Sequence, residues 1–104
     1  VARTEKAVDE IVGEVLRDLG LSACKLEQEA LETQIYVDTA HAIKGLEFRA
    51  VAIVAAEQIP LGSASISGDE DALQQERNLL YTAMTRPRER LYISWTGRGV
   101  AILA

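Results

Sequence analysis

The amino-acid sequence predicts a single small α/β domain in which helices flank a mostly parallel β-sheet. Three observations support this fold class. An amphipathic helical pattern opens the chain, an almost wholly apolar strand pattern stands near its middle, and a second long helical pattern runs directly into another strand. Such alternation is typical of layered α/β proteins. An unbroken apolar strand also fits a parallel sheet, whose strands are covered on both faces.

The first helix is predicted over residues 4–19. Gly20 follows directly and is a natural stop for this helix. Ser22–Leu26 is a short strand candidate, and the acidic residues 27–32 are predicted to form a loop or a turn of helix. Apolar residues recur along the helix at steps of three and four and place one stripe against a core: Val8, Ile11, Val12, Val15, Leu16 and Leu19.

Two stronger strand patterns follow the acidic stretch. Ile35–Thr39 is rich in β-branched and aromatic residues, which strands favour. Val51–Ala56 is apolar throughout, which predicts a strand buried on both faces. Pro60–Gly68 has the glycine- and serine-rich composition of a loop.

A second helix is predicted from Ser67 to Thr85. Ser67 and Glu70 have the spacing of a capping box, and Pro87 ends the helix because the residue before a proline is pushed out of helical geometry. Arg90–Trp95 alternates apolar and polar positions as a strand does. Three carboxylates in the first turn favour the helix dipole, and three apolar residues mark the inward face: Asp69, Glu70 and Asp71, then Leu73, Leu80 and Met84.

Composition excludes several classes of protein. No apolar run in the 104 residues approaches the roughly 20 that a membrane helix needs. The only cysteine, Cys24, excludes an internal disulfide and a cysteine-based zinc site and is expected to be a buried small residue. The only histidine, His41, excludes a multi-histidine metal centre. The net charge of −5 disfavours broad electrostatic binding of nucleic acid. We expect no metal site, no membrane contact and a cytoplasmic location.

Residues 39–48 are the first candidate for chemistry. They leave the end of a predicted strand, where α/β sheets bind ligands, and combine a hydroxyl, an imidazole, an ammonium, a glycine and a carboxylate. Lys44 and the backbone N–H groups near Gly45 are suited to a phosphate. The other interpretation is a solvated loop in which Lys44 and Glu47 face water. No GxxxxGK[ST] pattern occurs, so the chain carries no primary nucleotide-binding loop.

Arg86 is the second candidate. It stands where the second predicted helix stops before Pro87. A cation there compensates the negative end of the helix dipole. A guanidinium held on a rigid element is also suited to binding a phosphate. The local pattern does not decide between these two interpretations.

Together the two candidates resemble a known pair of motifs. Residues 39–48, TAHAIKGLEF, with the apolar strand that follows, resemble motif V of UvrD/Rep-type superfamily 1 DNA helicases. Residues 75–86, QERNLLYTAMTR, resemble motif VI, and their order and separation fit the same family. The resemblance implies that residues 1–104 are the C-terminal, second RecA-like domain of a longer helicase. Motif V then spans about 37–55 and motif VI about 75–88, on a RecA-like sheet of the P-loop NTPase type.

The resemblance also implies roles for individual residues. In the family the motif V glutamate meets the ribose of the nucleotide and the adjoining glycine lies near it, which maps to Glu47 and Gly45. Lys44 could serve either the nucleotide or the DNA. The motif VI arginine is an arginine finger on the γ-phosphate, which maps to Arg86; such fingers raise turnover by about 10³ to 10⁵. The start of motif V faces single-stranded DNA, which maps to Thr39 and His41.

Cofactors, partners and activity are implied in the same way. ATP and Mg²⁺ would be bound mainly by the first RecA-like domain of the same chain and not tightly by this one. The full-length protein would be an ATP-dependent DNA helicase that acts on single-stranded and duplex DNA with 3′-to-5′ polarity, and this piece alone would be inactive. Its pathway, among DNA repair, recombination and plasmid transfer, stays open.

Two departures from the family pattern keep alternatives open. Asn78 stands where an arginine is common, and Pro87 stands where an alanine is common. The large accessory subdomain that the best-known members insert at this point is either absent between Leu26 and Asp38 or has been removed there. A RecD-like or helicase–nuclease relative is one alternative, because such proteins share the motif VI sequence. A binding or regulatory module that keeps the fold without motor function is the alternative from a different class.

Overall fold

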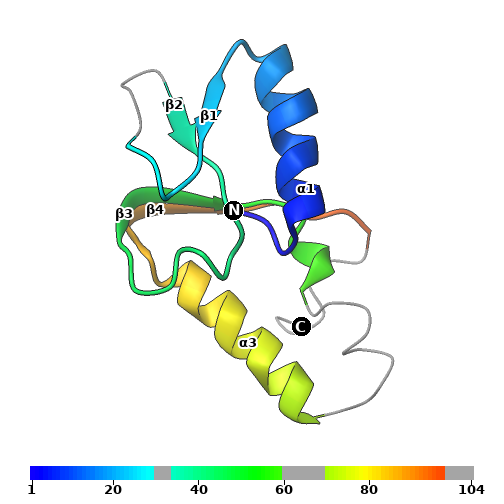
Figure 1. Ribbon diagram of the computed structural model, residues 1–104. Helices are drawn as coiled ribbons and strands as arrows, with labels where there is room; N and C mark the ends of the chain where they lie inside the picture. The colour runs from blue at the N-terminus through cyan, green and yellow to red at the C-terminus, as the bar shows by residue number, and fades with distance from the viewer. Residues whose placement is uncertain (30–33, 60–69, 98–104) are drawn as a thin grey trace.

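In the part of the chain that the structure describes, the strands run parallel, in two two-stranded sheets of order β1–β2 and β3–β4. The computed structural model describes residues 1–29, 34–59 and 70–97. The small α/β fold class predicted from the sequence is confirmed (Figure 1). In chain order the elements are α1 (Glu5–Glu10), the π-helix η1 (Ile11–Leu16), β1 (Ser22–Cys24), β2 (Gln34–Tyr36), β3 (Phe48–Ile53), the 3₁₀ turn η2 (Ala56–Gln58), α3 (Glu70–Met84) and β4 (Pro87–Ile93).

The first two residues of the chain link the two sheets. They run parallel to the end of β3 on one side and to the segment after β2 on the other. This dipeptide therefore occupies the position of a central strand and joins both sheets into one layer. The four backbone bonds are Val1 N to Ala52 O (2.6 Å), Val54 N to Val1 O (2.8 Å), Ala2 N to Asp38 O (3.3 Å) and Ala40 N to Ala2 O (2.8 Å).

The first helix begins as predicted, but its inner stripe differs. Thr4 is the N-cap, and its hydroxyl oxygen accepts from the backbone N–H of Ala7 at 3.2 Å. Gly20 ends the helical segment with a φ of +71°. The middle of the segment is π-helical, and its wider turn moves residues three and four apart off a shared face. Three of the predicted inward residues are consequently exposed: Val12 (37%), Val15 (51%) and Leu19 (67%).

The middle strands differ from prediction in their bounds and their cover. The strand predicted over Ile35–Thr39 is shorter in the structure, where β2 (Gln34–Tyr36) ends at Tyr36. Thr39 lies outside β2 and forms an isolated bridge with Ala2. The strand predicted as Val51–Ala56 is β3, which begins three residues earlier and ends before η2. The prediction that this strand is buried on both faces was wrong. Ala50 and Ala52 are exposed, whereas Val51 and Ile53 are buried. β3 is thus packed firmly on its α3 side only.

The strand predicted as Arg90–Trp95 is β4, which starts at Pro87, so Trp95 lies beyond its end and is exposed. Proline tolerates the first position of a strand because its missing N–H is not needed there. The predicted second helix is α3, whose Leu80 is buried while Leu73 and Met84 are partly buried. Glu70 and Asp71 stand in its first turn as predicted. Ser67, Asp69, residues 30–32 of the acidic stretch and the Pro60–Gly68 loop lie outside the described residues.

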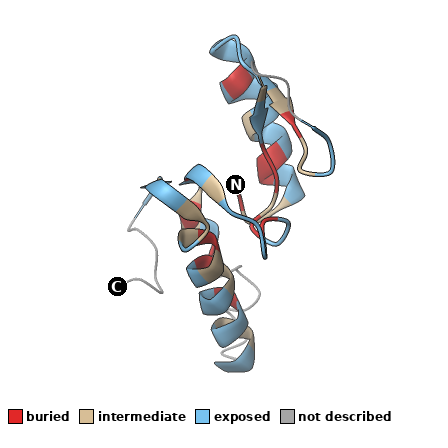
Figure 2. Ribbon diagram, turned by 90° about the vertical axis from the view of Figure 1, so that its left-hand side faces the viewer, coloured by how far each residue is buried: buried red, intermediate tan, exposed pale blue. Residues whose placement is uncertain are grey.

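The main core lies between β3 and α3. Cys24 is buried as predicted but lies apart from this core, at the end of β1. Figure 2 shows buried positions interleaved with exposed ones along α3, as expected for a helix covering one sheet face. The buried core residues are Ala40, Ile43, Val51, Ile53, Ala56, Ile59, Leu80 and Ala83.

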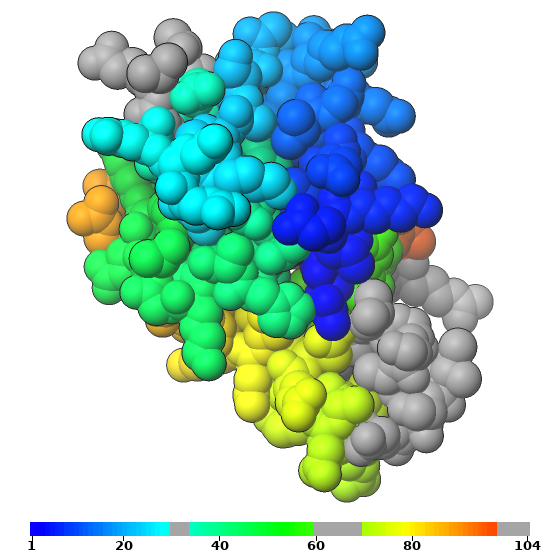
Figure 3. All heavy atoms as spheres, in the orientation of Figure 1, coloured from blue at the N-terminus to red at the C-terminus, as the bar shows by residue number. Residues whose placement is uncertain are grey.

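One largely buried ion pair ties the amino terminus to α3. Arg3 Nε lies 2.9 Å from Glu76 Oε1, and the two side chains are 16% and 7% exposed. In Figure 3 the dark-blue amino-terminal residues lie directly against the yellow α3. Glu76 thus turns a charged position of α3 inward, which the apolar spacing of the helix did not predict.

Candidate functional site

The loop of residues 40–47 is compact because successive turns hold it. Ala42 N donates to Thr39 O at 3.1 Å and Leu46 N donates to Ile43 O at 3.1 Å. Ile43 is fully buried in the main core and anchors the loop. With its apolar residue inward, the loop presents its polar side chains to solvent. The exposed residues of the loop are His41, Ala42, Lys44, Gly45, Leu46 and Glu47.

Gly45 is required by the backbone of this loop. Its φ is +80°, in the left-handed region that costs other residues roughly 1–2 kcal/mol. A Cβ built at Gly45 would meet no atom within 4 Å, so crowding from the domain itself does not demand a glycine. The space over Gly45 is open to a ligand.

A backbone hydrogen bond brings the two candidate motifs together. Phe48 N donates to Arg86 O at 3.0 Å, where β3 and β4 begin side by side. Glu47 precedes Phe48 in the chain, so its backbone lies next to that of Arg86 at the amino end of the β3–β4 pair. The predicted nucleotide contacts Gly45 and Glu47 therefore share one edge of the domain with the predicted arginine finger.

The Arg86 side chain lies along the end of α3. Its Nε donates to Thr82 O at 3.2 Å, and its Nη2 lies 3.3 Å from Thr85 Oγ1. The guanidinium thus satisfies a carbonyl of the last helical turn, at the negative end of the helix dipole. Pro87 begins β4 in register with Phe48 and leaves Arg86 at the edge of the domain. Asn78 is exposed and accepts from Gln74 Nε2 at 3.0 Å.

Thr39 lies at the opposite edge, and the loop leads from it through His41, whose carbonyl accepts from Lys44 N at 3.5 Å, toward Gly45. Thr39 bridges Ala2, which stands level with the carboxyl end of β3. Since the six residues of β3 rise about 3.3 Å each, the two edges are about 20 Å apart along the strands. Thr39 therefore lies at a carboxyl end of the sheet, as the sequence predicted for residues 39–48, whereas Glu47 lies at the amino end of β3. Beside Thr39, the buried Asp38 accepts from the backbone N–H of Thr39 at 2.8 Å and from that of Leu26 at 3.3 Å.

Sequence reasoning missed Arg3 and Glu76. They are 73 positions apart, so no local spacing connects them. The one available signal was the spacing of Glu76, which lies four positions before Leu80 and seven before Ala83. These spacings place Glu76 on the same face of α3 as two buried residues.

Residues 1–29, 34–59 and 70–97 contain no group of three His, Cys, Asp or Glu side chains placed to hold a metal ion. None of the helices in these ranges has the length and apolar character needed to cross a membrane.

Residues 2–98 match the UvrD-like helicase C-terminal domain family. The chain belongs to this family. The match includes both candidate motifs and the Arg3–Glu76 pair. The family resemblance drawn from residues 39–48 and 75–86 is therefore confirmed.

Relatives of the chain include helicases several times its length. PcrA of Staphylococcus aureus, an ATP-dependent DNA helicase, is 38% identical over 81 residues, which are 76% of this chain and 11% of PcrA. UvrD1 of Mycobacterium leprae, also an ATP-dependent DNA helicase, is 45% identical over 56 residues, which are 54% of this chain and 7% of UvrD1. The UvrD-like domain thus spans only a small part of the curated relatives that it matches.

A solved structure shares the fold. It is the C-terminal domain of a possible DNA helicase from Lactobacillus plantarum, with a TM-score of 0.72 over 99% of this chain and 58% of that one. The identity is 24%, so this likeness concerns the fold alone.

Proposed function

We propose that residues 1–104 form the second RecA-like motor domain of an ATP-dependent DNA helicase that moves 3′ to 5′ on single-stranded DNA. In this proposal Arg86 is the arginine finger of an ATP site whose phosphate loop lies on the first RecA-like domain of the same polypeptide. The observation that carries the proposal is the backbone bond between Phe48 and Arg86, which joins motif V to motif VI at one edge.

The amino edge of β3–β4 has the groups that a nucleotide site needs. Glu47 is exposed and offers acceptors for ribose hydroxyls, and the open space over Gly45 lets a nucleotide approach the backbone. Lys44 and Arg86 supply cationic donors for phosphate. Mg²⁺ and the triphosphate would be held mainly by the first domain, so this chain would complete the site only when the two domains close.

Arg86 can reach a phosphate by exchanging acceptors. In the domain alone its guanidinium bonds to a carbonyl and a hydroxyl of the last helical turn. A γ-phosphate offers charged oxygens, and charge-assisted bonds are roughly twice as strong as neutral ones. The guanidinium would therefore leave the helix end when ATP is bound and return to it after the nucleotide departs.

Thr39, at the opposite edge, and His41, in the loop that follows it, are proposed to contact the phosphates of single-stranded DNA. The separation of Thr39 from the nucleotide edge fits a motor that holds DNA and ATP at different places. Because the net charge is −5, we expect local contacts at these residues rather than a broad basic surface.

The decisive experiment measures single-strand-stimulated ATPase of the full-length helicase that carries this domain. Arg86→Ala should lower turnover by about 10³ to 10⁵. Arg86→Lys should also be severely impaired, because an ammonium lacks the planar fork of a guanidinium. Arg88→Ala is the matched control, since Arg88 is an exposed arginine two residues away on β4, and it should keep the wild-type rate.

Other outcomes separate the remaining interpretations. Wild-type turnover by a folded Arg86→Ala protein would refute the arginine finger. Absence of ATPase in the full-length wild-type protein would favour the non-motor module. Robust ATPase by the 104-residue chain alone would contradict the two-domain site, for which we expect no turnover and only weak DNA binding.

A further inference from the structure

Asp38 is a buried carboxylate to which the proposed function gives no role. It stands directly before Thr39, and only 8% of it is exposed. Lys25 Nζ lies 4.0 Å from Asp38 Oδ1 but 2.9 Å from Glu5 Oε2, so the lysine is hydrogen-bonded to Glu5. A buried carboxylate needs hydrogen-bond donors, and those that Asp38 uses are backbone N–H groups.

The two carboxylate oxygens hold two different segments of the chain. Oδ1 accepts from Thr39 N at 2.8 Å, and Oδ2 accepts from Leu26 N at 3.3 Å. An ionised carboxylate can accept both bonds at once, so the side chain joins the two segments. Val37 N donates to Cys24 O at 2.9 Å one step earlier. Asp38 therefore extends the junction of these segments past the ends of β1 and β2.

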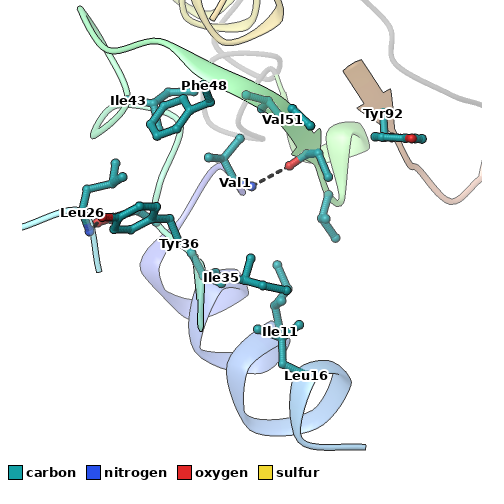
Figure 4. Close-up of a pocket in the computed structure, with 15 residues that line it drawn as sticks. Val1, Ile11, Leu16, Leu26, Ile35, Tyr36, Ile43, Phe48, Val51 and Tyr92 are labelled. Carbon is teal, nitrogen blue, oxygen red and sulfur yellow. Dashed lines mark hydrogen bonds between the residues drawn. The ribbon is translucent and has the colours of Figure 1, made fainter. Parts of the chain in front are cut away.

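Leu26 is a firm anchor for this junction. Its side chain is partly buried and packs against the main core. It also lines an apolar cavity of about 430 Å³ together with Tyr36 and Ile43 (Figure 4). Close packing limits how far such a residue can move. The bond from Leu26 N therefore holds the Asp38 carboxylate in a fixed place.

The backbone of Thr39 is consequently held on both sides. Its N–H is bonded to Asp38 Oδ1, and its carbonyl accepts from Ala42 N at 3.1 Å. A threonine side chain has few χ1 positions, so the place of its hydroxyl follows from the backbone. Binding groups need to be held within about 0.5 Å of their working position. The Asp38 bond supplies such a constraint to the proposed DNA contact.

The charge of Asp38 argues that it acts through Thr39 and not on DNA directly. A carboxylate beside a phosphate contact repels the phosphate. An ionised carboxylate also has no hydrogen to donate to phosphate oxygens. Any benefit of Asp38 to DNA binding must therefore come through the N–H groups that it holds. Neutralising Asp38 without moving Thr39 would strengthen DNA binding, whereas moving Thr39 would weaken it.

We propose that Asp38 is a positioning residue for the DNA contact: its carboxylate ties the backbone of Thr39 to that of Leu26, so that the Thr39 hydroxyl meets a phosphate of single-stranded DNA. The inference rests on the proposed function, because it takes Thr39 as a DNA contact.

The ATPase of the full-length helicase, measured over a range of oligo(dT) concentrations, tests the proposal. Asp38→Asn keeps the shape of the side chain but accepts through one oxygen only. We expect the oligo(dT) concentration for half-maximal stimulation to rise about fivefold, with unchanged turnover at saturating oligo(dT). Asp18→Asn is the matched control, since it removes the same charge from an exposed position of the first helical segment, and it should change neither value.

Thr39→Val separates this inference from the proposed function. Without the hydroxyl, the half-maximal concentration should rise about tenfold. Adding Asp38→Asn to Thr39→Val should then have little further effect, because both changes act on one contact. An unchanged concentration for Thr39→Val would refute the DNA contact itself. If Thr39→Val raises the concentration, an unchanged or lower value for Asp38→Asn would overturn the positioning role.

Two further results bear on the proposal. The same rise from Asp38→Asn in the Thr39→Val background would overturn it, because Asp38 would then act through another group. If Asp38→Asn does not fold, Asp38→Ser decides the same question, since its single short oxygen cannot accept from both N–H groups. Asp38→Ser should also raise the half-maximal concentration at unchanged turnover, and an unchanged concentration would contradict the proposal.

Discussion

Removing Glu76 should destabilise this domain far more than removing another carboxylate with the same ion-pair geometry. Glu76 Oε1 lies 2.9 Å from Arg3 Nε, and Glu89 Oε2 lies 2.8 Å from Arg49 Nε. The two pairs differ in exposure: the side chains are 16% and 7% exposed in the first pair, and 81% and 57% in the second. Solvent weakens the exposed pair, whereas loss of Glu76 leaves the largely buried Arg3 charge without this partner.

The expected magnitudes follow from this difference in burial. Glu76→Ala should cost about 3–5 kcal/mol, the range for breaking a buried pair by removing one partner. Glu89→Ala should cost about 0–1 kcal/mol. In a domain of this size, 1 kcal/mol shifts the Tm by about 4–8 °C, so Glu76→Ala should lower the Tm by at least about 12 °C. Loss of helix propensity does not explain such a drop, because alanine is the best helix former.

Thermal and urea unfolding followed by circular dichroism measure both variants. A third protein, with Arg3→Met and Glu76→Leu together, should recover most of the lost stability, because an apolar pair often replaces a buried ion pair at little cost. If Glu76→Ala costs no more than Glu89→Ala, burial does not determine the strength of the Arg3 pair and the reasoning is refuted.

Three further predictions concern the cap, the loop and the amino terminus. Thr4→Ala should cost about 1 kcal/mol in urea unfolding, because the Ala7 N–H loses its side-chain acceptor; Thr4→Ser should keep most of the stability. Gly45→Ala should cost about 1–2 kcal/mol because of the positive φ, and Gly13→Ala, at a helical position without a positive φ, should not destabilise the chain. The folded Val1 amine has a pKa below 8.0, so between these two values the unfolded chain binds more protons and stability should rise with pH, levelling off above about pH 8. Urea unfolding at pH 6.5 and 8.5 measures this rise, and an equal rise in a chain whose Val1 amine has been acetylated would assign it to another group.

The parts of the fold that depend on neighbouring residues could be predicted from the sequence. The Thr4 start and the Gly20 stop of the first helix, and the end of α3 before Pro87, follow from short-range backbone preferences. The inner stripe of the first helix was only partly predicted, because Val15 and Leu19 are inward on a regular α-helix but exposed here. The π-helical turns and the absence of a covering element among the described residues are properties of the folded chain.

The candidate site shows the same division. Motif resemblance picked out Glu47 and Arg86, since both stand inside continuous runs of characteristic residues. Their position at the amino edge, away from Thr39, could not be predicted, because it depends on which strand pairs with which. Neither the sequence around Arg3 nor the sequence around Glu76 indicates the ion pair, because the two side chains meet only when α3 packs against the start of the chain.

The bond from Phe48 N to Arg86 O has a mechanical consequence. It joins the end of the loop of residues 40–47 to the residue that follows α3, so a displacement of either backbone segment is transmitted to the other. If a nucleotide pulls on Glu47, the base of Arg86 moves with it, and only the arginine side chain remains free to adjust. The backbone bond would thus determine where the Arg86 side chain begins, and a change of side-chain conformation would bring the guanidinium to the phosphate.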